Sequence, residues 1–252
     1  MAGGADWGGD EYLLPTMTTE EHLAELRGRL LTSLAAWGAG SLVGWAAAPG
    51  WLRRFAADVG QPFVFVSPGE AFASYLKAAL FIGLALASPV ILYQAWLFVL
   101  PALFPHERQA ARRYLIPSLL LFVIGVAFGF FVAYPFALRF LLGFGGERVT
   151  PALSVSRFLA FFVSVTVPFG LAFQFPVVLS LLVQLGLTTA ARLAQLRRSV
   201  YFAVFVVAAI VTPPDVVSQI LLAIPVIVLY ELTIWRLRKG AGAGGRGEAV
   251  RG

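Results

Sequence analysis

The chain has no cysteine and few charged side chains. Its 252 residues include two histidines and no cysteine, which excludes disulfides, thiolate metal sites and cysteine nucleophiles. Only 13% of the residues are charged and 59% are hydrophobic, whereas about 25% of a typical soluble domain is charged. Neither an HExxH nor a GxxxxGK[ST] motif occurs, so a zinc protease of that type and a P-loop ATPase are unsupported. This composition predicts an integral membrane protein without a metal or cofactor.

Six apolar stretches predict six transmembrane helices and an all-α integral membrane fold. They are residues 30–48, 71–103, 114–137, 158–185, 200–211 and 216–235. About 20 apolar residues in a helix cross a hydrocarbon layer of ~30 Å, and a helix satisfies its own backbone polar groups in lipid. Pro89 and Pro101 in the second stretch predict a bend or a strong tilt.

The fifth stretch, residues 200–211, is short. As a helix it measures only about 18 Å, and the prolines of Thr212-Pro213-Pro214-Asp215 end it abruptly because neither can donate a helical hydrogen bond. Either the bilayer is thinner around the fifth and sixth helices, or tilt elsewhere hides the mismatch. The run 62–68, which is β-prone and lies between prolines, is expected to be extended.

The basic residues predict that both termini are cytoplasmic. With the N-terminus inside, more of them fall on inner segments than on outer ones, as the positive-inside rule requires. The inner set is Arg27, Arg29, Arg108, Arg112, Arg113, Arg192, Arg197, Arg198, Arg236, Arg238, Lys239, Arg246 and Arg251, and the outer set is Arg53, Arg54, Lys77, Arg139, Arg148 and Arg157. The net charge of +6 therefore indicates loop arginines rather than nucleic-acid binding.

The chain divides into one membrane domain and two tails. Residues 1–17 are expected to be a flexible extension, 18–238 a single six-helix membrane domain and 239–252 a Gly-rich, basic, disordered tail. The polar start lacks the positive residues and short apolar core of a signal peptide, so the first span is expected to insert uncleaved.

Two segments at the predicted inner surface carry candidate binding residues. His22, Glu25 and Arg29 have spacings of three and four, so they share a helix face; the alternative is a surface helix that only anchors the first span. Glu107 lies among arginines after the second stretch. It belongs either to a salt-bridged loop or to an acidic site for a cationic ligand such as a guanidinium group.

Further polar residues lie at or near the expected spans. Glu70 and Lys77, which follow Ser67-Pro68, share a helix face, and the simplest interpretation is an interface ion pair or a snorkelling lysine. Gln174 is central in the fourth stretch. An amide there either contacts a ligand or forms a hydrogen bond between helices.

The turn before the last stretch suggests a cap and a docking point. Asp215 is placed to cap the sixth helix with its carboxylate. Thr212, Ser218 and Gln219 add polar groups next to the short fifth helix. The alternatives are a capped turn alone and a polar docking point for a partner transmembrane helix.

These motifs, taken in order, resemble the TatC family, the core subunit of the twin-arginine protein translocase. The matching residues run from about 18 to 235 and are His22-Leu23-x-Glu25-Leu26-Arg27-x-Arg29, Ser67-Pro68-x-Glu70-Ala71-Phe72, Lys77, Tyr93-Gln94-x-Trp96-x-Phe98, Pro101-Ala102-Leu103, Glu107-Arg108, Phe173-x-x-Pro176, Thr212-Pro213-Pro214-Asp215-x-x-Ser218-Gln219, Ala223-x-Pro225 and Tyr230-Glu231. Many family members carry glutamate where this chain has Gln174, so a charge-dependent role at that position is in doubt.

The resemblance implies a fold and a function. It implies a concave bundle of six tilted, proline-kinked helices in a bacterial or archaeal cytoplasmic membrane. It implies a receptor, not an enzyme, that binds signal peptides with paired arginines and exports folded proteins using the proton-motive force. The implied partners are TatA- and TatB-type single-span subunits, twin-arginine precursors, membrane lipid and further copies of the chain, but not nucleic acid.

The resemblance also implies a signal-peptide site on the inner face. Its expected residues are His22, Glu25, Arg27, Arg29, Phe98, Leu103, Glu107 and Arg108. Our hypothesis is that Glu25 and Glu107 pair with the two arginines of the signal peptide. The main rival function is a secondary transporter of a small solute, which would need titratable groups at the span centres. An intramembrane enzyme would need a catalytic pair there.

Overall fold

The structure, a computed structural model, describes residues 19–59, 63–100, 105–143 and 152–248. Within these ranges the side chains of Thr19, Asp58, residues 105–107, Ala110 and residues 240–248 are not described. The predicted extension at residues 1–17 and the predicted site residue Leu103 lie outside the described part of the chain.

The described residues form a bundle of helices, which confirms the all-α fold class. In chain order these are α1 (Thr19–Val59), α2 (Pro68–Val99), α3 (Pro105–Arg112), α4 (Leu115–Phe128), the π-helical segment η2 (Gly129–Ala133), α5 (Tyr134–Gly143), α6 (Val155–Ala172), α7 (Phe175–Gln184), α8 (Ala190–Gln195), α9 (Arg197–Val211) and α10 (Val216–Glu248). The β-prone run contributes an isolated parallel bridge between Val64 and Ser154. α10 extends to Glu248, into the segment predicted to be a disordered tail, and the division into a domain and two tails stays a prediction.

Five helical segments are long and apolar enough to cross a membrane. Within the described residues they are Glu20–Ala57, Pro68–Val99, Leu115–Gly143, Val155–Gln184 and Val216–Lys239. The fifth predicted span corresponds to α9, whose 15 residues measure about 22 Å. It ends where the sequence predicts, because Thr212 leaves the helical conformation just before Pro213.

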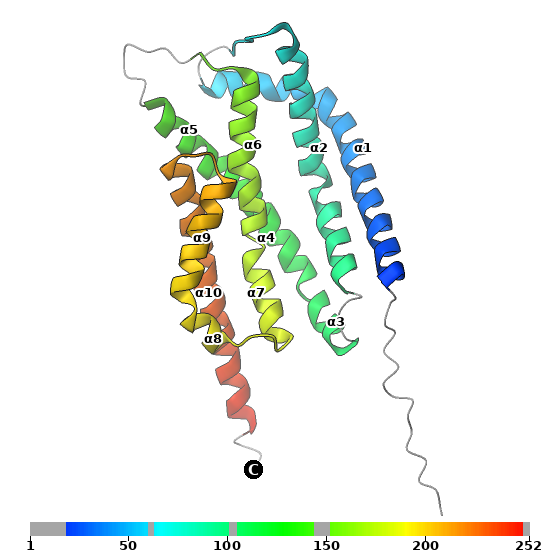
Figure 1. Ribbon diagram of the computed structural model, residues 1–252, viewed down its shortest axis with the longest axis vertical. Coiled ribbons are helices and arrows are strands. Elements are labelled where there is room, and N and C mark those ends of the chain that lie inside the picture. Colours follow the sequence, from blue (N-terminus) through cyan, green and yellow to red (C-terminus); the bar gives the residue numbers. More distant parts are fainter. Residues whose placement is uncertain (1–18, 60–62, 101–104, 144–151, 249–252) are drawn as a thin grey trace, which may run out of the picture.

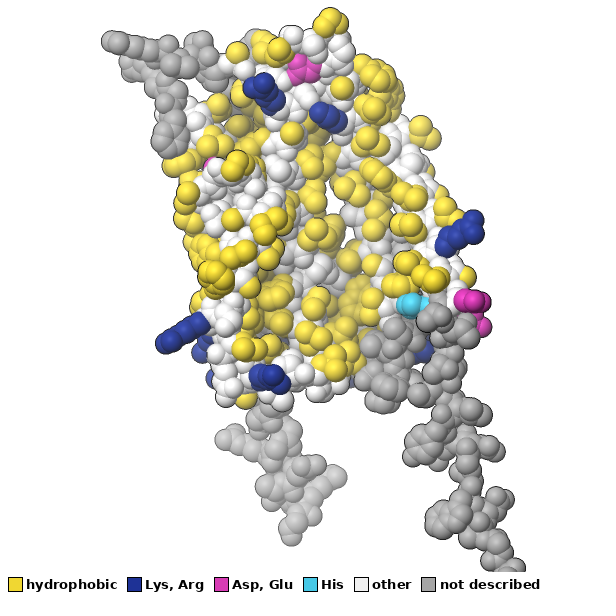
Figure 2. Space-filling model, in the orientation of Figure 1, with side chains coloured by type: hydrophobic (Ala, Val, Ile, Leu, Met, Phe, Trp, Pro, Cys, Tyr) yellow, Lys and Arg dark blue, Asp and Glu magenta, His cyan; other side chains and the backbone are white. Residues whose placement is uncertain are grey.

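Helices run between two ends of the bundle (Figure 1). We call the end at which α1 begins the lower end and the opposite one the upper end, as in Figure 1. α3, α8 and the last turns of α10 also lie at the lower end, so α1 starts on the side of the bundle at which α10 finishes. Figure 2 shows hydrophobic side chains across the middle of one face and most of its Lys and Arg side chains toward the two ends. This distribution fits a bundle that crosses a lipid bilayer.

The first helix is longer than predicted. The sequence places a loop from Pro49 onward, but α1 continues through Pro49 to Val59, and Figure 1 shows its light-blue end crossing the upper end of the bundle. Phe55 in this end is 4% exposed, and its ring centroid lies 5.0 Å from that of Phe162 and 5.6 Å from that of Tyr134. Burial of aromatic surface therefore favours a helix where proline alone suggests a stop.

α1 and α2 pack closely through small residues. A Cβ atom on Gly44 would lie 2.3 Å from the Ala79 carbonyl oxygen, and one on Gly40 would lie 2.7 Å from that of Gly83. Trp37 Nε1 donates a hydrogen bond of 2.9 Å to the Leu80 carbonyl across the same interface. Small residues at a spacing of four allow backbones to approach in membranes, where lipid removes the hydrophobic force between helices.

Prolines and a π-helical segment bend the other helices. η2 interrupts the span that begins with α4 and ends two residues before Pro135. Residues 173–174 form a turn between α6 and α7, two residues before Pro176. Each break has a local cause, since proline lacks a donor and π-helical turns alter the bonding pattern.

We expect Gly44→Leu to lower the free energy of unfolding by about 1–3 kcal/mol, because the side chain would force α1 away from α2. Gly38→Leu is the matched control, since nothing lies within 4 Å of a Cβ atom there. Thermal unfolding of the purified variants in detergent measures the difference. Equal loss of stability in both would contradict the close approach of the helices.

Candidate functional site

A half-paired carboxylate lies at the start of α1. Arg29 Nη2 donates to Glu25 Oε1 at 3.1 Å, which confirms that the two residues share a helix face, and Arg29 Nη1 donates to Gln94 Oε1 of α2 at 3.1 Å. The Glu25 side chain is only 16% exposed. Its second oxygen, Oε2, is buried and has no hydrogen-bond partner among the described residues. Such an oxygen is an acceptor for a donor from outside the chain.

Aromatic contact joins the two predicted halves of this site. The His22 ring stacks on the Phe98 ring at 4.5 Å between centroids, so the first turns of α1 lie against the last turn of α2. Arg27 is exposed. Arg108 is half-buried in α3, which also contains Glu107. The side chain of Glu107 and all of Leu103 lie outside the described residues, so their place in the site stays a prediction. We call His22, Glu25, Arg29, Gln94 and Phe98 the α1 site.

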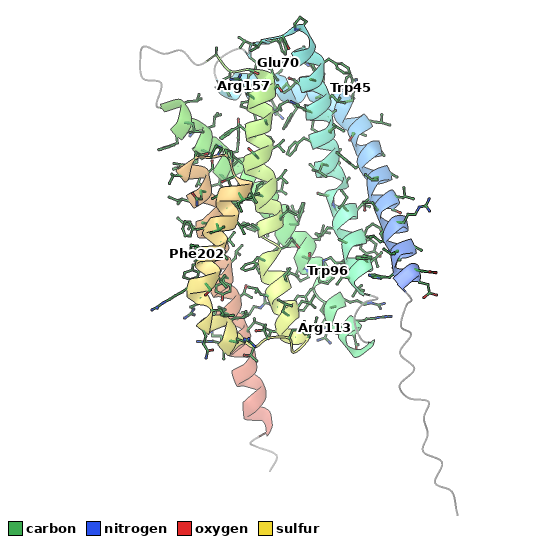
Figure 3. The ribbon with its side chains drawn as sticks, viewed as in Figure 1. Trp45, Glu70, Trp96, Arg113, Arg157 and Phe202 are labelled. Atoms are coloured by element: carbon green, nitrogen blue, oxygen red, sulfur yellow. The ribbon has the colours of Figure 1, made fainter. Side chains whose placement is uncertain are left out.

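Gln174 is held by hydrogen bonds between helices. Ser118 Oγ of α4 donates to Gln174 Oε1 at 2.5 Å, and Gln174 Nε2 donates to the Ser118 carbonyl at 3.1 Å. Trp96 Nε1 of α2 donates to Ser118 Oγ at 2.9 Å, and Figure 3 places Trp96 toward the lower half of the bundle. This confirms the interhelical alternative for Gln174.

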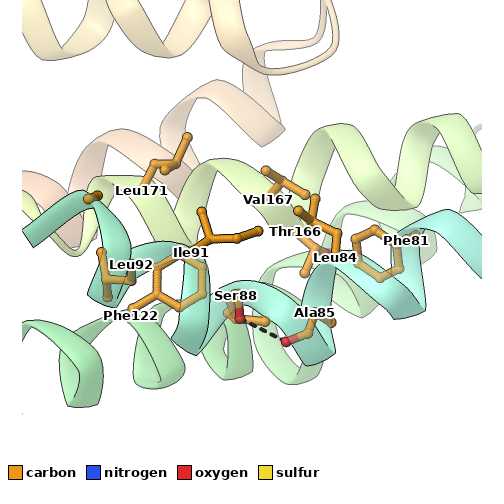
Figure 4. A pocket seen from close by; sticks show the side chains of 12 residues that line it. Phe81, Leu84, Ala85, Ser88, Ile91, Leu92, Phe122, Thr166, Val167 and Leu171 are labelled. Atoms are coloured by element: carbon orange, nitrogen blue, oxygen red, sulfur yellow. Dashed lines mark hydrogen bonds between the residues drawn. The ribbon is translucent and has the colours of Figure 1, made fainter. Parts of the chain in front are cut away.

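Two adjoining apolar hollows lie between α2 and α6–α7. The first has a volume of about 380 Å³, is backed by Phe122 and Val126 of α4 and includes the buried Thr166 (Figure 4). The second measures about 340 Å³ and includes Trp96 and Gln174. The hollows share Leu92 and Ala95 of α2. Together they form an apolar groove with an amide near one end.

Of the two interpretations of Glu70 and Lys77, an interface ion pair or a snorkelling lysine, the ion pair is wrong, because the two side chains do not pair in the part of the chain that the structure describes. In the described structure both side chains instead bind the start of α6: Glu70 accepts from Ser154 Oγ, and Lys77 Nζ donates to Ser156 Oγ at 2.6 Å. Glu70 Oε2 also accepts from the Val66 N–H at 2.5 Å. The bonds to Ser154 and Ser156 link α2 to a segment far away in the sequence. Residue spacing within one helix cannot reveal such a contact. Figure 3 shows Glu70 near the start of α6.

The other residues of this group begin α2. Ser67 is the N-cap position, but its side chain makes no capping hydrogen bond, and Pro68 is the first helical residue. Proline suits that position because its missing N–H is unneeded there.

The α9–α10 turn contains the predicted cap. Asp215 Oδ1 accepts from the Ser218 N–H at 2.7 Å, which confirms that Asp215 caps α10. Thr212 and Ser218 are 6% and 1% exposed, and the Thr212 hydroxyl donates to Ala208 of its own helix. Gln219 is partly exposed and donates to the Phe205 carbonyl. The hydroxyls of Thr212 and Ser218 thus face the interior of the described chain rather than a partner.

One polar cluster was missed as a candidate site. Glu231 of α10 accepts from Arg197 Nη2 at 2.7 Å and from the Tyr201 hydroxyl at 2.5 Å, both on α9. The neighbouring Tyr230 is fully buried and donates to the Leu193 carbonyl at 2.6 Å. A glutamate within a predicted span was the available signal, because such a charge requires a partner.

Comparisons with known proteins all point to one family. A family model described as Sec-independent protein translocase protein (TatC) matches residues 21–225. A TatC protein of Carboxydothermus hydrogenoformans is 38% identical over 87% of this chain and 92% of its own length. One of Aquifex aeolicus is 39% identical over 87% of this chain and 94% of its own length. A crystal structure of the twin-arginine translocase receptor TatC is 40% identical and superposes with a TM-score of 0.72 over 85% of this chain and 97% of that one.

We expect Gln174→Leu and Ser118→Ala to show a coupling energy of about 0.5–1.7 kcal/mol, the range measured for hydrogen bonds between membrane helices. A double-mutant cycle on thermal or denaturant unfolding in detergent measures it. Ser164→Ala serves as the control partner because its hydroxyl bonds only within α6, to Phe161. Additive effects in both cycles would mean that the bond between the Ser118 and Gln174 side chains contributes nothing to stability.

Proposed function

Because the chain belongs to the TatC family of Sec-independent protein translocase proteins, we propose that it is the receptor and core subunit of a twin-arginine translocase. Its solved relative of 40% identity is described as the twin-arginine translocase receptor. The chain is a multi-pass membrane protein and a translocase component rather than an enzyme. In this role it binds twin-arginine signal peptides and takes part in proton-motive export of folded proteins.

The lower end of the bundle faces the cytoplasm in this proposal, and α9 crosses the membrane as the fifth of six spans, in addition to the five long apolar segments. The positive-inside rule supports this orientation, because α1, α3, α8 and α10 bring most of the basic residues to the lower end. α1 starts and α10 finishes at the same end of the bundle, which supports an even number of membrane crossings. The membrane is then the bacterial or archaeal cytoplasmic membrane.

The α1 site receives one arginine of the signal peptide. The observation that carries this proposal is the buried, unpartnered Oε2 of Glu25, on a carboxylate whose other oxygen is bonded to Arg29. A guanidinium group donates to carboxylates in a fixed fork geometry. The stacked His22 and Phe98 rings next to this carboxylate supply an aromatic surface on which a second guanidinium can stack.

Glu107 receives the other arginine. Its helix, α3, follows the end of α2 at the lower end of the bundle, where Phe98 contacts His22. Arg27, Leu103 and Arg108 complete the surface around the two carboxylates. Two separate carboxylates would explain a requirement for paired arginines, because each captures one charge.

Glu25→Gln should weaken binding of a twin-arginine peptide by roughly 10- to 100-fold, since a hydrogen bond to a charged group contributes about 1.5–3 kcal/mol. Glu20→Gln, in the first turn of the same helix and exposed, should have little effect. Affinity for a labelled peptide, compared with its double-lysine version, measures both. Glu107→Ala should weaken peptide cross-linking in the same way, and unchanged capture by the Glu25→Gln, Glu107→Ala double variant would falsify the site.

α9 and α10 form the docking surface for a TatA- or TatB-type single-span helix. α9 is shorter than a bilayer core, and a short helix lowers its mismatch by associating with another helix. One exposed apolar face of α9 is formed by Phe202, Val206 and Ile210, which are spaced four apart and are 72%, 41% and 76% exposed. Figure 3 shows Phe202 on the outer side of α9. Gln219 offers an amide beside this face. Thr212 and Ser218 shape the turn that follows α9.

Photo-cross-linkers at Phe202 and Ile210 should capture the partner helix in membranes, whereas one at Leu42 of α1 should not. Leu42 is a matched control because it is apolar and 77% exposed on another helix. Cross-linking from Leu42 equal to that from α9, or none from α9, would contradict this docking surface.

A further inference from the structure

A basic hollow opens at the lower end of the bundle, between α4, α7 and α10. Its volume is about 690 Å³, within the range of about 300–1,000 Å³ that ligand pockets occupy. Arg113 and Tyr114, directly before α4, line one side, and Arg236 of α10 lines another. The hollow contains none of the residues of the α1 site.

The two arginines of this hollow are unpaired. Neither Arg113 nor Arg236 has an ion pair or hydrogen bond to the described residues, whereas Arg29 and Arg197 at the same end are each bound to a glutamate. Among the described residues that line the hollow there is no aspartate or glutamate. The hollow therefore carries an uncompensated charge that favours an anion.

The position of the hollow matches the level of lipid headgroups. Arg113 lies two residues before the span Leu115–Gly143, and Arg236 lies in the last turn of Val216–Lys239. Gln184, which also lines the hollow, is the last residue of Val155–Gln184. The walls combine polar groups with the apolar side chains of Pro117, Val183 and Leu237, so the site suits a ligand with a charged head and an apolar body.

We propose that this hollow binds the phosphodiester headgroup of an anionic phospholipid in the leaflet at the lower end. Arg113 and Arg236 bind the phosphate oxygens, as guanidinium groups do in basic pockets between membrane helices. Tyr114 and Gln184 supply further donors for the headgroup. The apolar wall contacts the glycerol and the first acyl carbons, which a free phosphate ion or an acidic peptide lacks.

The test is lipid binding to the purified full-length chain, followed by native mass spectrometry with phosphatidylglycerol and phosphatidylcholine. The wild type should prefer phosphatidylglycerol, and Arg113→Gln, Arg236→Gln should weaken its binding about 25-fold, because each arginine near a membrane surface contributes roughly fivefold. The control Arg192→Gln, Arg198→Gln removes two exposed arginines at the same end that do not line the hollow, and should change binding less than twofold.

Two further measurements distinguish a lipid headgroup from other anionic ligands. Inorganic phosphate or an acidic peptide that displaces phosphatidylglycerol at equal concentration would overturn the proposal, as would equal losses in the double variant and its control. Phosphatidylglycerol should also raise the Tm of the wild type but not of the double variant. If the double variant does not purify as a single species, Arg113→Gln and Arg236→Gln separately should each weaken binding about fivefold.

Discussion

Hydrogen bonds between helices hold this bundle together, because lipid removes most of the hydrophobic force that joins helices in water. Three clusters of such bonds join segments distant in the sequence, besides the bonds of Trp37 and Arg29 that join α1 to α2. Trp96, Ser118 and Gln174 connect α2, α4 and the α6–α7 turn. Glu70 connects the start of α2 to that of α6, and Glu231 connects α10 to α9. Between these points, small residues such as Gly44 let the helices approach closely.

Local spacing in the sequence predicted the short-range contacts. The bond between Glu25 and Arg29 follows from a spacing of four, and the Asp215 cap follows from a carboxylate before a helix start. The partners of Glu70 and Lys77 could not be predicted in this way. They lie on the start of α6, and a single sequence contains no signal for contacts between distant segments.

Helix ends were predicted well only where the chemistry of the turn decides them. Two prolines end α9 at the expected place, because neither can donate a helical hydrogen bond. The first apolar stretch ends at residue 48, yet α1 continues through Pro49, because Phe55 beyond it is buried among Phe158, Phe162 and Tyr134. A proline costs about 3 kcal/mol in a helix, and each aromatic pair of this kind contributes about 0.5–1.5 kcal/mol beyond the burial of its surface. Tertiary packing therefore decides whether a proline ends a helix or only bends it.

A balance between a local cost in stability and a compensating contact also explains why a receptor site can coexist with a stable bundle. Arg29 holds one oxygen of Glu25 and is itself fixed by Gln94, so the carboxylate is oriented before any ligand arrives. Leaving Oε2 buried without a partner costs stability, and this cost is recovered when a cationic ligand binds. Glu231, in contrast, has both oxygens bonded within the chain. This difference supports the proposal that Glu25 binds the ligand and that Glu231 stabilises the fold.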